Sequence, residues 1–355
     1  MKKMYYPINI KSYVNNICSQ KQYKELQNEW KELRKSIIET CVRKNITKSK
    51  AKKIFPPYMN RILLCNFSKL NEIFNYVDFL ESYEKEFAKR IFNYDFIKST
   101  VSGIPAKKNY LNSIKGLSTR SGKIADFFMK PEFNKNITTC FYCDANYINA
   151  YPAIGNTSNK KRKNSKRQFE LDHFFEKEKC PITALSLFNL IPCCKICNGK
   201  SIKGSTPLPK FYNINQKNYN YDYFSPSSFN YQFEQNVKIR VIPIKGKQWA
   251  PQIGFVAHSS NYQIKFFTKS KIYRKEINAF FLEERYNYVN NKNEALNLLD
   301  LKQKYSDANI SLIANTLAKN GIHIPATEIK EAIFHQRADK ENHRIFGKMK
   351  EDILK

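Results

Sequence analysis

The sequence contains no apolar run long enough to cross a membrane. Its first twelve residues also lack the uninterrupted apolar segment of a secretory signal. We therefore expect neither a transmembrane nor a secreted protein, and we predict a cytoplasmic location without a membrane partner. In the cytoplasm thiols stay reduced, so paired cysteines bind metal more often than they form disulfides.

Acidic residues are scarce. The 355 residues include 31 Asp and Glu against 61 Lys and Arg, which gives a formal net charge of +30. A surplus of this size produces a positive field that attracts polyanions, above all nucleic acid. The alternative is a Lys-, Asn- and Tyr-rich composition that follows an AT-rich genome. Hydrophobic residues make up 42% of the chain, enough for one large domain or two to three smaller ones.

Histidine is also scarce, with five residues, and cysteine occurs nine times. Four cysteines form two CxxC pairs about fifty residues apart, Cys140/Cys143 and Cys194/Cys197, which together match a tetrahedral structural Zn²⁺ site. Cys193 adjoins the second pair, but only Cys194 has the two-residue gap to Cys197. The alternative is a coincidence of motifs with buried free thiols. The other cysteines are expected to be ordinary core or surface thiols: Cys18, Cys41, Cys65 and Cys180.

The apolar spacing predicts an α+β fold that is mainly helical. Residues 20–55 fit one amphipathic helix ended by Pro56-Pro57, residues 59–98 continue the helical spacing, and residues 100–123 fit a loop. We therefore predict a helical region over residues 1–138.

A cysteine-flanked core is expected over residues 139–206, and Pro207 and Pro209 mark its end. Its residues 160–167 include six basic side chains, which fit either a solvated loop or a phosphate contact. Residues 207–355 should form a mixed region, with strands at Phe229–Phe233, Val237–Ile242 and Tyr262–Phe267 followed by several helices. This last region is expected to act as a scaffold or to bind a partner or nucleic acid.

Between the CxxC pairs lie groups suited to phosphodiester hydrolysis. Phe169–Phe175 fits a strand, which would place Asp172 and His173 on opposite faces unless the strand ends there. Hydrolysis needs a base to activate water and a cation to neutralise the developing charge. The imidazole of His173 suits the first task and the carboxylate of Asp172 suits Mg²⁺.

Two asparagines complete the set. Asn198 follows Cys197 and should face Asp172, because neighbouring residues lie about 100° apart around a helix and the zinc would hold the other side. Asn189 lies five residues before Cys194. Taken alone, each asparagine fits an ordinary turn or cap residue, and Lys200 fits a solvated surface lysine as well as a phosphate contact. The remaining histidines lack metal-ligand spacing and are expected to be structural or exposed: His258, His323, His335 and His343.

The segment Leu171-Asp-His-Phe-Phe, with Asn189 and Cys194-Lys-Ile-Cys-Asn198, resembles the HNH, or ββα-metal, endonucleases in an H-N-N variant. The resemblance covers residues 139–204. It implies a small zinc-stapled core in which His173 is the general base and Asp172 and Asn198 bind a catalytic Mg²⁺ or Mn²⁺. It further implies that Asn189 bonds to loop backbone and orients His173. The expected activity is hydrolysis of DNA phosphodiester bonds.

The longer phrase Ala184-Leu-Ser-Leu-Phe-Asn-Leu-Ile-Pro-Cys-Cys is similar to Septu-type HNH nucleases of bacterial anti-phage systems. That resemblance implies a defence effector that works with an ATPase or another defence-system protein. Two alternatives stay open: a non-catalytic, zinc-containing nucleic-acid-binding subunit, and the same nuclease chemistry directed at RNA, including tRNA. Contacts to the phosphate backbone carry little sequence information and do not separate DNA from RNA.

Overall fold

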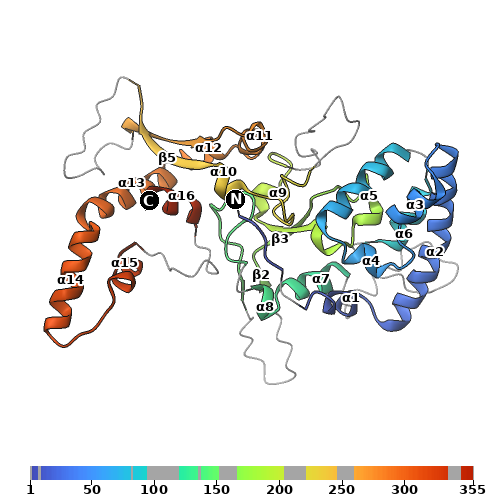
Figure 1. The fold of residues 1–355 in the computed structure, drawn as a ribbon, viewed down its shortest axis with the longest axis horizontal. Coiled ribbons are helices and arrows are strands. Elements are labelled where there is room, and N and C mark those ends of the chain that lie inside the picture. Colours follow the sequence, from blue (N-terminus) through green and yellow to red (C-terminus); the bar gives the residue numbers. More distant parts are fainter. Residues whose placement is uncertain are drawn as a thin grey trace.

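The computed structural model describes residues 2–6, 9–80, 83–93, 120–134, 137–151, 166–203, 221–245, 260–334 and 345–354. These residues form an elongated, mainly helical molecule with three two-stranded antiparallel sheets, and this confirms the predicted α+β class (Figure 1). None of the described helices combines the length and the apolar character that a membrane crossing requires.

The N-terminal region is helical, as predicted. Ser19 and Gln22 form a reciprocal capping box at the start of its longest helix, and the Trp30 indole in that helix donates to the Pro56 carbonyl at 3.0 Å. The helices are α1 (Ser12–Ile17), α2 (Gln20–Arg43), α3 (Lys48–Ile54), α4 (Asn60–Leu63), α5 (Phe67–Leu80), α6 (Lys85–Ile91), α7 (Arg120–Phe128) and α8 (Pro131–Asn134).

Two predictions for this region are wrong in detail. The single helix expected over residues 20–55 is two helices, because Asn45 adopts a positive φ of 63° between α2 and α3. Asparagine tolerates this left-handed conformation, which ends a helix. The loop expected over residues 100–123 lies mostly outside the described residues, but α7 already begins at Arg120.

The central region contains two short antiparallel pairs. β1 (Ala150–Tyr151) pairs with β2 (Lys166–Arg167), and β3 (Glu170–His173) pairs with β4 (Leu190–Cys193). The 3₁₀ turns η1 (Pro181–Thr183) and η2 (Leu187–Asn189) connect β3 to β4, and α9 (Lys195–Asn198) follows β4 directly. The order is therefore strand, strand, helix over residues 170–198.

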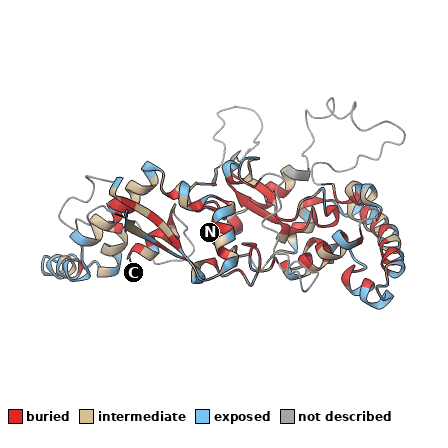
Figure 2. Ribbon diagram, turned by 90° about the horizontal axis from the view of Figure 1, so that it is seen from above, coloured by how far each residue is buried: buried red, intermediate tan, exposed pale blue. Residues whose placement is uncertain are grey.

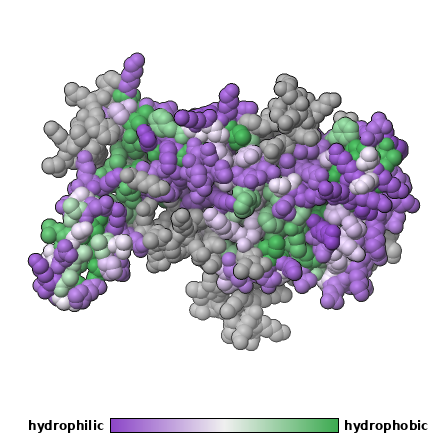
Figure 3. Space-filling view, viewed as in Figure 1, coloured by the Kyte–Doolittle hydropathy of each residue, from purple (hydrophilic) through white to green (hydrophobic). Residues whose placement is uncertain are grey.

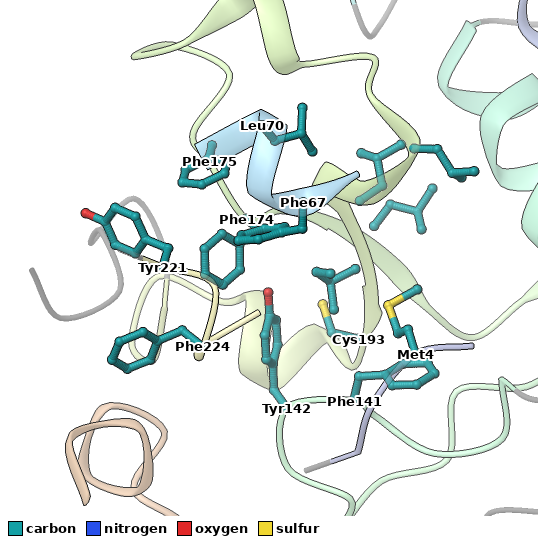
Figure 4. Close-up of a cluster of buried hydrophobic side chains, with 14 of the residues drawn as sticks. Met4, Phe67, Leu70, Phe141, Tyr142, Phe174, Phe175, Cys193, Tyr221 and Phe224 are labelled. Carbon is teal, nitrogen blue, oxygen red and sulfur yellow. The ribbon is translucent and has the colours of Figure 1, made fainter. Parts of the chain in front are cut away.

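Aromatic rings join the central region to the N-terminal helices. Phe174 and Phe175 follow β3 and pack against Phe67 of α5, with ring centroids 5.0 Å and 5.3 Å away (Figure 4). Phe74 of α5 stacks on Phe175 at 4.5 Å. Aromatic pairs of this kind contribute beyond the area they bury, so they fix α5 against the loop that follows His173.

The C-terminal region is mixed, as predicted, but one expected strand is absent. Phe229–Phe233 forms turns that lead into a helix, and Phe229 itself is 87% exposed. The backbone N–H of Gln232 donates to the Tyr273 hydroxyl rather than to a neighbouring strand. The elements are α10 (Phe233–Asn236), β5 (Lys238–Pro243), β6 (Tyr262–Phe267), α11 (Lys271–Ala279), α12 (Leu282–Tyr286), α13 (Val289–Lys304), α14 (Asp307–Lys319), α15 (Ala326–Phe334) and α16 (Gly347–Leu354).

One hydrophobic cluster includes buried residues from Met4 to Ile353, and therefore from all three expected regions. Buried segments extend along most of the length of the molecule (Figure 2). The boundaries near residues 138 and 206 stay predictions, although the described core is shared across them.

Asp144, which follows Cys143 at a φ of +54°, anchors both ends of the described chain. Its carboxylate forms a buried ion pair with Lys2 at 2.8 Å and accepts from the Thr139 hydroxyl at 2.8 Å. The same side chain accepts from the backbone N–H of Lys348 at 3.2 Å, and its carbonyl accepts from Phe346 at 2.7 Å. The first cysteine pair is thus tied to Lys2 near the N-terminus and to the start of α16.

We expect Asp144→Asn to lower the free energy of unfolding by about 3–5 kcal/mol, because the buried Lys2 ammonium loses its counter-charge. Asparagine tolerates a positive φ, so the substitution tests the charge and not the backbone. Urea denaturation measures the change, and Asp307→Asn, which removes an exposed partner of Lys330, should change little. Similar midpoints for both variants would contradict the role of Asp144.

Candidate metal centre and catalytic site

The four predicted cysteines meet in one cluster. The Sγ atoms of Cys140, Cys143, Cys194 and Cys197 all lie within 4.8 Å of one another, and all four residues are buried. Cys194 caps the N-terminus of α9, and Cys197 lies inside that helix. The cluster can hold a metal ion such as Zn²⁺, and the choice of Cys194 over Cys193 is confirmed. All nine cysteines have free thiols, and the other five lie outside the cluster.

Hydrogen-bond donors surround the sulfur atoms. The backbone N–H of Cys194 donates to Cys140 at 3.3 Å, and the N–H of Ala145 donates to Cys143 at 3.5 Å. The hydrogen bond from Cys140 is the largest influence on the thiol of Cys194, whose pKa is lowered to about 7. The pKa of Cys143 is also lowered, mainly by its hydrogen bond with Cys140, whereas burial raises the pKa of Cys140 itself. N–H donors to sulfur favour thiolate, the form that binds metal, so the residues fit Zn²⁺.

Arg285 of α12 belongs to the same site. Its Nη1 donates to Cys197 Sγ at 3.1 Å, although 88 residues separate the two in the sequence. A four-thiolate zinc site carries a net negative charge, which the guanidinium offsets. The sequence analysis missed Arg285, and no spacing or motif in the sequence marks it.

Chelation of the metal, or Cys143→Ser, should unfold the central region, because binding energy at a structural zinc site is folding energy. The wild type should contain one zinc per chain by elemental analysis, and Cys143→Ser should lose both the zinc and several degrees of melting temperature. Cys193→Ser is a matched control, since Cys193 is equally buried and adjoins Cys194 but lies outside the cluster. Unchanged thermal stability of Cys143→Ser would count against the zinc assignment.

The strand predicted over Phe169–Phe175 is present as β3 but spans only Glu170–His173, and α9 contacts it through Asn198. The Asn198 amide donates to the Glu170 carboxylate at 2.8 Å. Glu170 and Asp172 lie two residues apart on one strand, so their side chains share a face. Asn198 thus lies on the Asp172 face of β3, but its described hydrogen bond is to Glu170 rather than to Asp172.

Asp172 is buried and both of its carboxylate oxygens are engaged. The Tyr142 hydroxyl donates to Oδ2 at 2.6 Å, and the Lys203 ammonium donates to Oδ1 at 2.6 Å. Lys203 is itself 4% exposed and also donates to the His173 carbonyl at 2.9 Å. The lysine at the site is therefore Lys203, which the sequence analysis missed, whereas Lys200 is exposed.

His173 is the last residue of β3, and its ring has a partner outside this ion pair. Its Nε2 lies 3.0 Å from the carbonyl oxygen of Ala184, which directly follows η1, and the residue is partly exposed. Burial of the ring is the largest influence on the His173 pKa, which falls to about 4 despite the opposing effect of Asp172. The imidazole is therefore neutral near pH 7, which is the form that can accept a proton.

Asn189 is fully buried and binds backbone at three points. Its Oδ1 accepts from the Phe175 N–H at 2.7 Å, and its Nδ2 donates to the carbonyls of Phe175 and Thr183, each at 3.1 Å. These bonds hold the loop that follows His173 against η1. The carbonyl of Ala184, the next residue after η1, is the hydrogen-bond partner of the His173 ring. The backbone contacts are those that the resemblance implies, and the orienting role of Asn189 stays a prediction.

The other histidines and the basic segment add no described contact to the site. His323 is exposed beside α14, while His258, His335 and His343 lie outside the described residues. Most of the basic segment 160–167 also lies outside them. Among the described residues, the cysteine cluster is the one group of three or more His, Cys, Asp or Glu side chains that could hold a metal.

Comparison of the chain with protein-family models, with curated proteins and with solved structures found no match. The likeness to HNH endonucleases therefore depends on the residues named above and on their arrangement.

We expect Lys203→Met to destabilise the zinc-loaded protein by about 3–5 kcal/mol, because it leaves the Asp172 carboxylate buried without a cation. The double variant Asp172→Asn/Lys203→Met should lose less than the sum of the two single variants, since both charges are then gone. Urea denaturation of the four proteins measures the coupling. Strictly additive losses would show that the two side chains do not stabilise each other.

Proposed function

We propose that this chain is a metal-dependent endonuclease of the HNH type that hydrolyses DNA phosphodiester bonds. The observation that carries the proposal is the antiparallel β3–β4 pair followed by α9, with the four cysteines clustered beside it. Asp172 and His173 lie on β3, and Asn198 lies on α9. The Asn189 bonds to loop backbone support the same conclusion.

In this proposal His173 activates the attacking water. When Nε2 carries the proton and donates to the Ala184 carbonyl, Nδ1 is the unprotonated nitrogen that can accept a proton from water. The bond to Ala184 also fixes the plane of the ring. A lowered pKa keeps the imidazole neutral, so the base is available across the neutral range.

Asp172 and Asn198 would hold the catalytic Mg²⁺ or Mn²⁺, since carboxylate and carboxamide oxygens are the ligands that such ions prefer. When bound, the cation neutralises negative charge that develops on the scissile phosphate. Asn198 uses its Nδ2 for Glu170, which leaves its Oδ1 as the ligand atom. The Lys203 ammonium must release or share the Asp172 carboxylate when the cation binds.

The Asp172–Lys203 pair also favours one alternative, a zinc-containing subunit that binds nucleic acid without cleaving it. In that case the ion pair is purely structural and no cation replaces Lys203. The same nuclease chemistry acting on RNA or tRNA is the other alternative. By its resemblance to Septu-type nucleases, we propose further that the chain acts in bacterial anti-phage defence with an ATPase partner.

The test is cleavage of plasmid DNA and of structured RNA with Mg²⁺ or Mn²⁺, comparing the wild type with His173→Ala. We expect the variant to lose at least about a hundredfold in cleavage rate, because general-base catalysis contributes about 10²–10⁴. Nucleic-acid binding should be retained. His323→Ala, at an exposed histidine outside the site, is the control and should cleave as the wild type does.

Equal cleavage by the wild type and His173→Ala would remove the catalytic assignment. Tight binding by both with no cleavage by either would favour the non-catalytic alternative. Cleavage of RNA in preference to plasmid would keep the chemistry and change the substrate.

A further inference from the structure

Residues 40–71 contain eight Lys and Arg and no Asp or Glu. The segment runs from the end of α2 through α3 and α4 into α5. Six of its basic side chains are exposed, and we call these six the basic tract: Arg43, Lys48, Lys50, Lys52, Lys53 and Arg61.

The fold presents the tract to solvent on a fixed support. Thr47 caps α3 by accepting from the Lys50 N–H at 3.3 Å, and Ala51 and Ile54 are fully buried against the rest of the core. The lysines of this short helix are left on its outer side. The end of the molecule that carries α2 and α3 is largely hydrophilic (Figure 3).

Ion pairs do not compensate the charge of the tract. Within the described part of the chain, none of its six side chains lies in one, although Tyr76 and, behind it, Glu72 raise the pKa of Lys50. Glu72 itself pairs with Lys69 at 2.6 Å. Arg43 donates to the Thr40 hydroxyl, and Arg61 lies 5.9 Å from the ring of the exposed Tyr58. Exposed cations without ion-pair partners, beside an aromatic ring, are typical of a surface that binds nucleic acid.

The preceding helix provides a contrast. Residues 20–39 of α2 contain five Lys and Arg and four Glu, so their net charge is only +1. Four of these lysines are as exposed as those of the tract: Lys21, Lys24, Lys31 and Lys35. The tract is therefore a local concentration of charge rather than a sample of the basic composition.

The tract lies one helix away from the candidate catalytic loop. The Lys69 ammonium of α5 donates to the Lys53 carbonyl of α3 at 2.8 Å. On its other side, α5 packs through Phe67 and Phe74 on Phe175. The Ser186 hydroxyl also donates to the Ile62 carbonyl of α4 at 2.9 Å. A helix is about 10 Å in diameter, and duplex DNA carries one phosphate per about 3.4 Å of its axis on each strand. A duplex that contacts the tract therefore passes α5 within about three phosphates.

We propose that the basic tract is a binding surface for the DNA phosphate backbone, which positions a duplex beside the loop that follows His173. The role of that position in cleavage rests on the proposed nuclease function. Binding itself does not, because phosphate contacts by the tract can be measured in a protein that cleaves nothing.

The experiment measures binding of a short fluorescent DNA duplex by anisotropy across a salt series, with His173→Ala in every protein so that no cleavage occurs. The tract variant is Lys48→Gln/Lys50→Gln/Lys52→Gln/Lys53→Gln. The matched control is Lys21→Gln/Lys24→Gln/Lys31→Gln/Lys35→Gln, which removes the same charge from α2. Glutamine and lysine have similar helix propensities, so both variants should fold, and circular dichroism checks this.

We expect the tract variant to lose at least about tenfold in affinity near physiological salt and to reduce the slope of log K against log[salt] by about 2–4, since each phosphate contact contributes about 0.9. The control should keep the wild-type slope within about 1. Replacing the same four tract lysines by arginine should retain binding.

Equal losses in the tract variant and the control would overturn the proposal, because net charge alone would then explain binding. Unchanged binding by the tract variant would overturn it as well. If binding depends on the tract but the wild type cleaves no nucleic acid, the result contradicts the nuclease function alone. If the wild type cleaves DNA but the tract variant binds as tightly as the wild type, the result contradicts the role of the tract alone.

Discussion

The convergence of four thiols on one point is the constraint on which the rest of the structure depends. Cys140 and Cys194 lie 54 residues apart in the sequence, and their cluster brings the first cysteine pair against the start of α9, with β3 and β4 in the chain between them. Other segments then attach to the cluster. The Tyr286 hydroxyl donates to the Cys143 carbonyl at 2.8 Å, and Arg285 donates to Cys197. A metal held there would therefore stabilise the C-terminal helices as well as the strands, because their contacts require the cysteine turns to be in place.

Two buried ion pairs adjoin this cluster, Lys2–Asp144 and Asp172–Lys203. Burying a charge is costly unless it is paired and hydrogen-bonded, and both carboxylates accept an additional hydroxyl bond. A chain with 31 acidic and 61 basic residues thus uses some of its few carboxylates inside, while the described basic residues that are buried are four lysines: Lys2, Lys203, Lys348 and Lys350. The excess of basic residues leaves the exposed lysines of α3 without ion pairs among the described residues, and we propose that they attract phosphate.

Local patterns predicted local features well. The CxxC spacing identified the correct four cysteines, and alternation identified β5 and β6, because both signals depend on neighbours in the chain. The same alternation failed at Phe229–Phe233, where the backbone bonds to the Tyr273 side chain instead of a strand. The helix expected over residues 20–55 failed at Asn45, where a single positive φ outweighed continuous apolar spacing.

The sequence by itself determined which residue types could supply thiolate, imidazole and carboxylate chemistry, since those are properties of single side chains and their spacing. Only the tertiary structure decided their partners. It brought Lys203 and Tyr142 to Asp172, turned Asn198 toward Glu170, and carried Arg285 to Cys197. These contacts join residues from 28 to 88 positions apart, and such distances are closed by packing of the whole core, which no local pattern encodes.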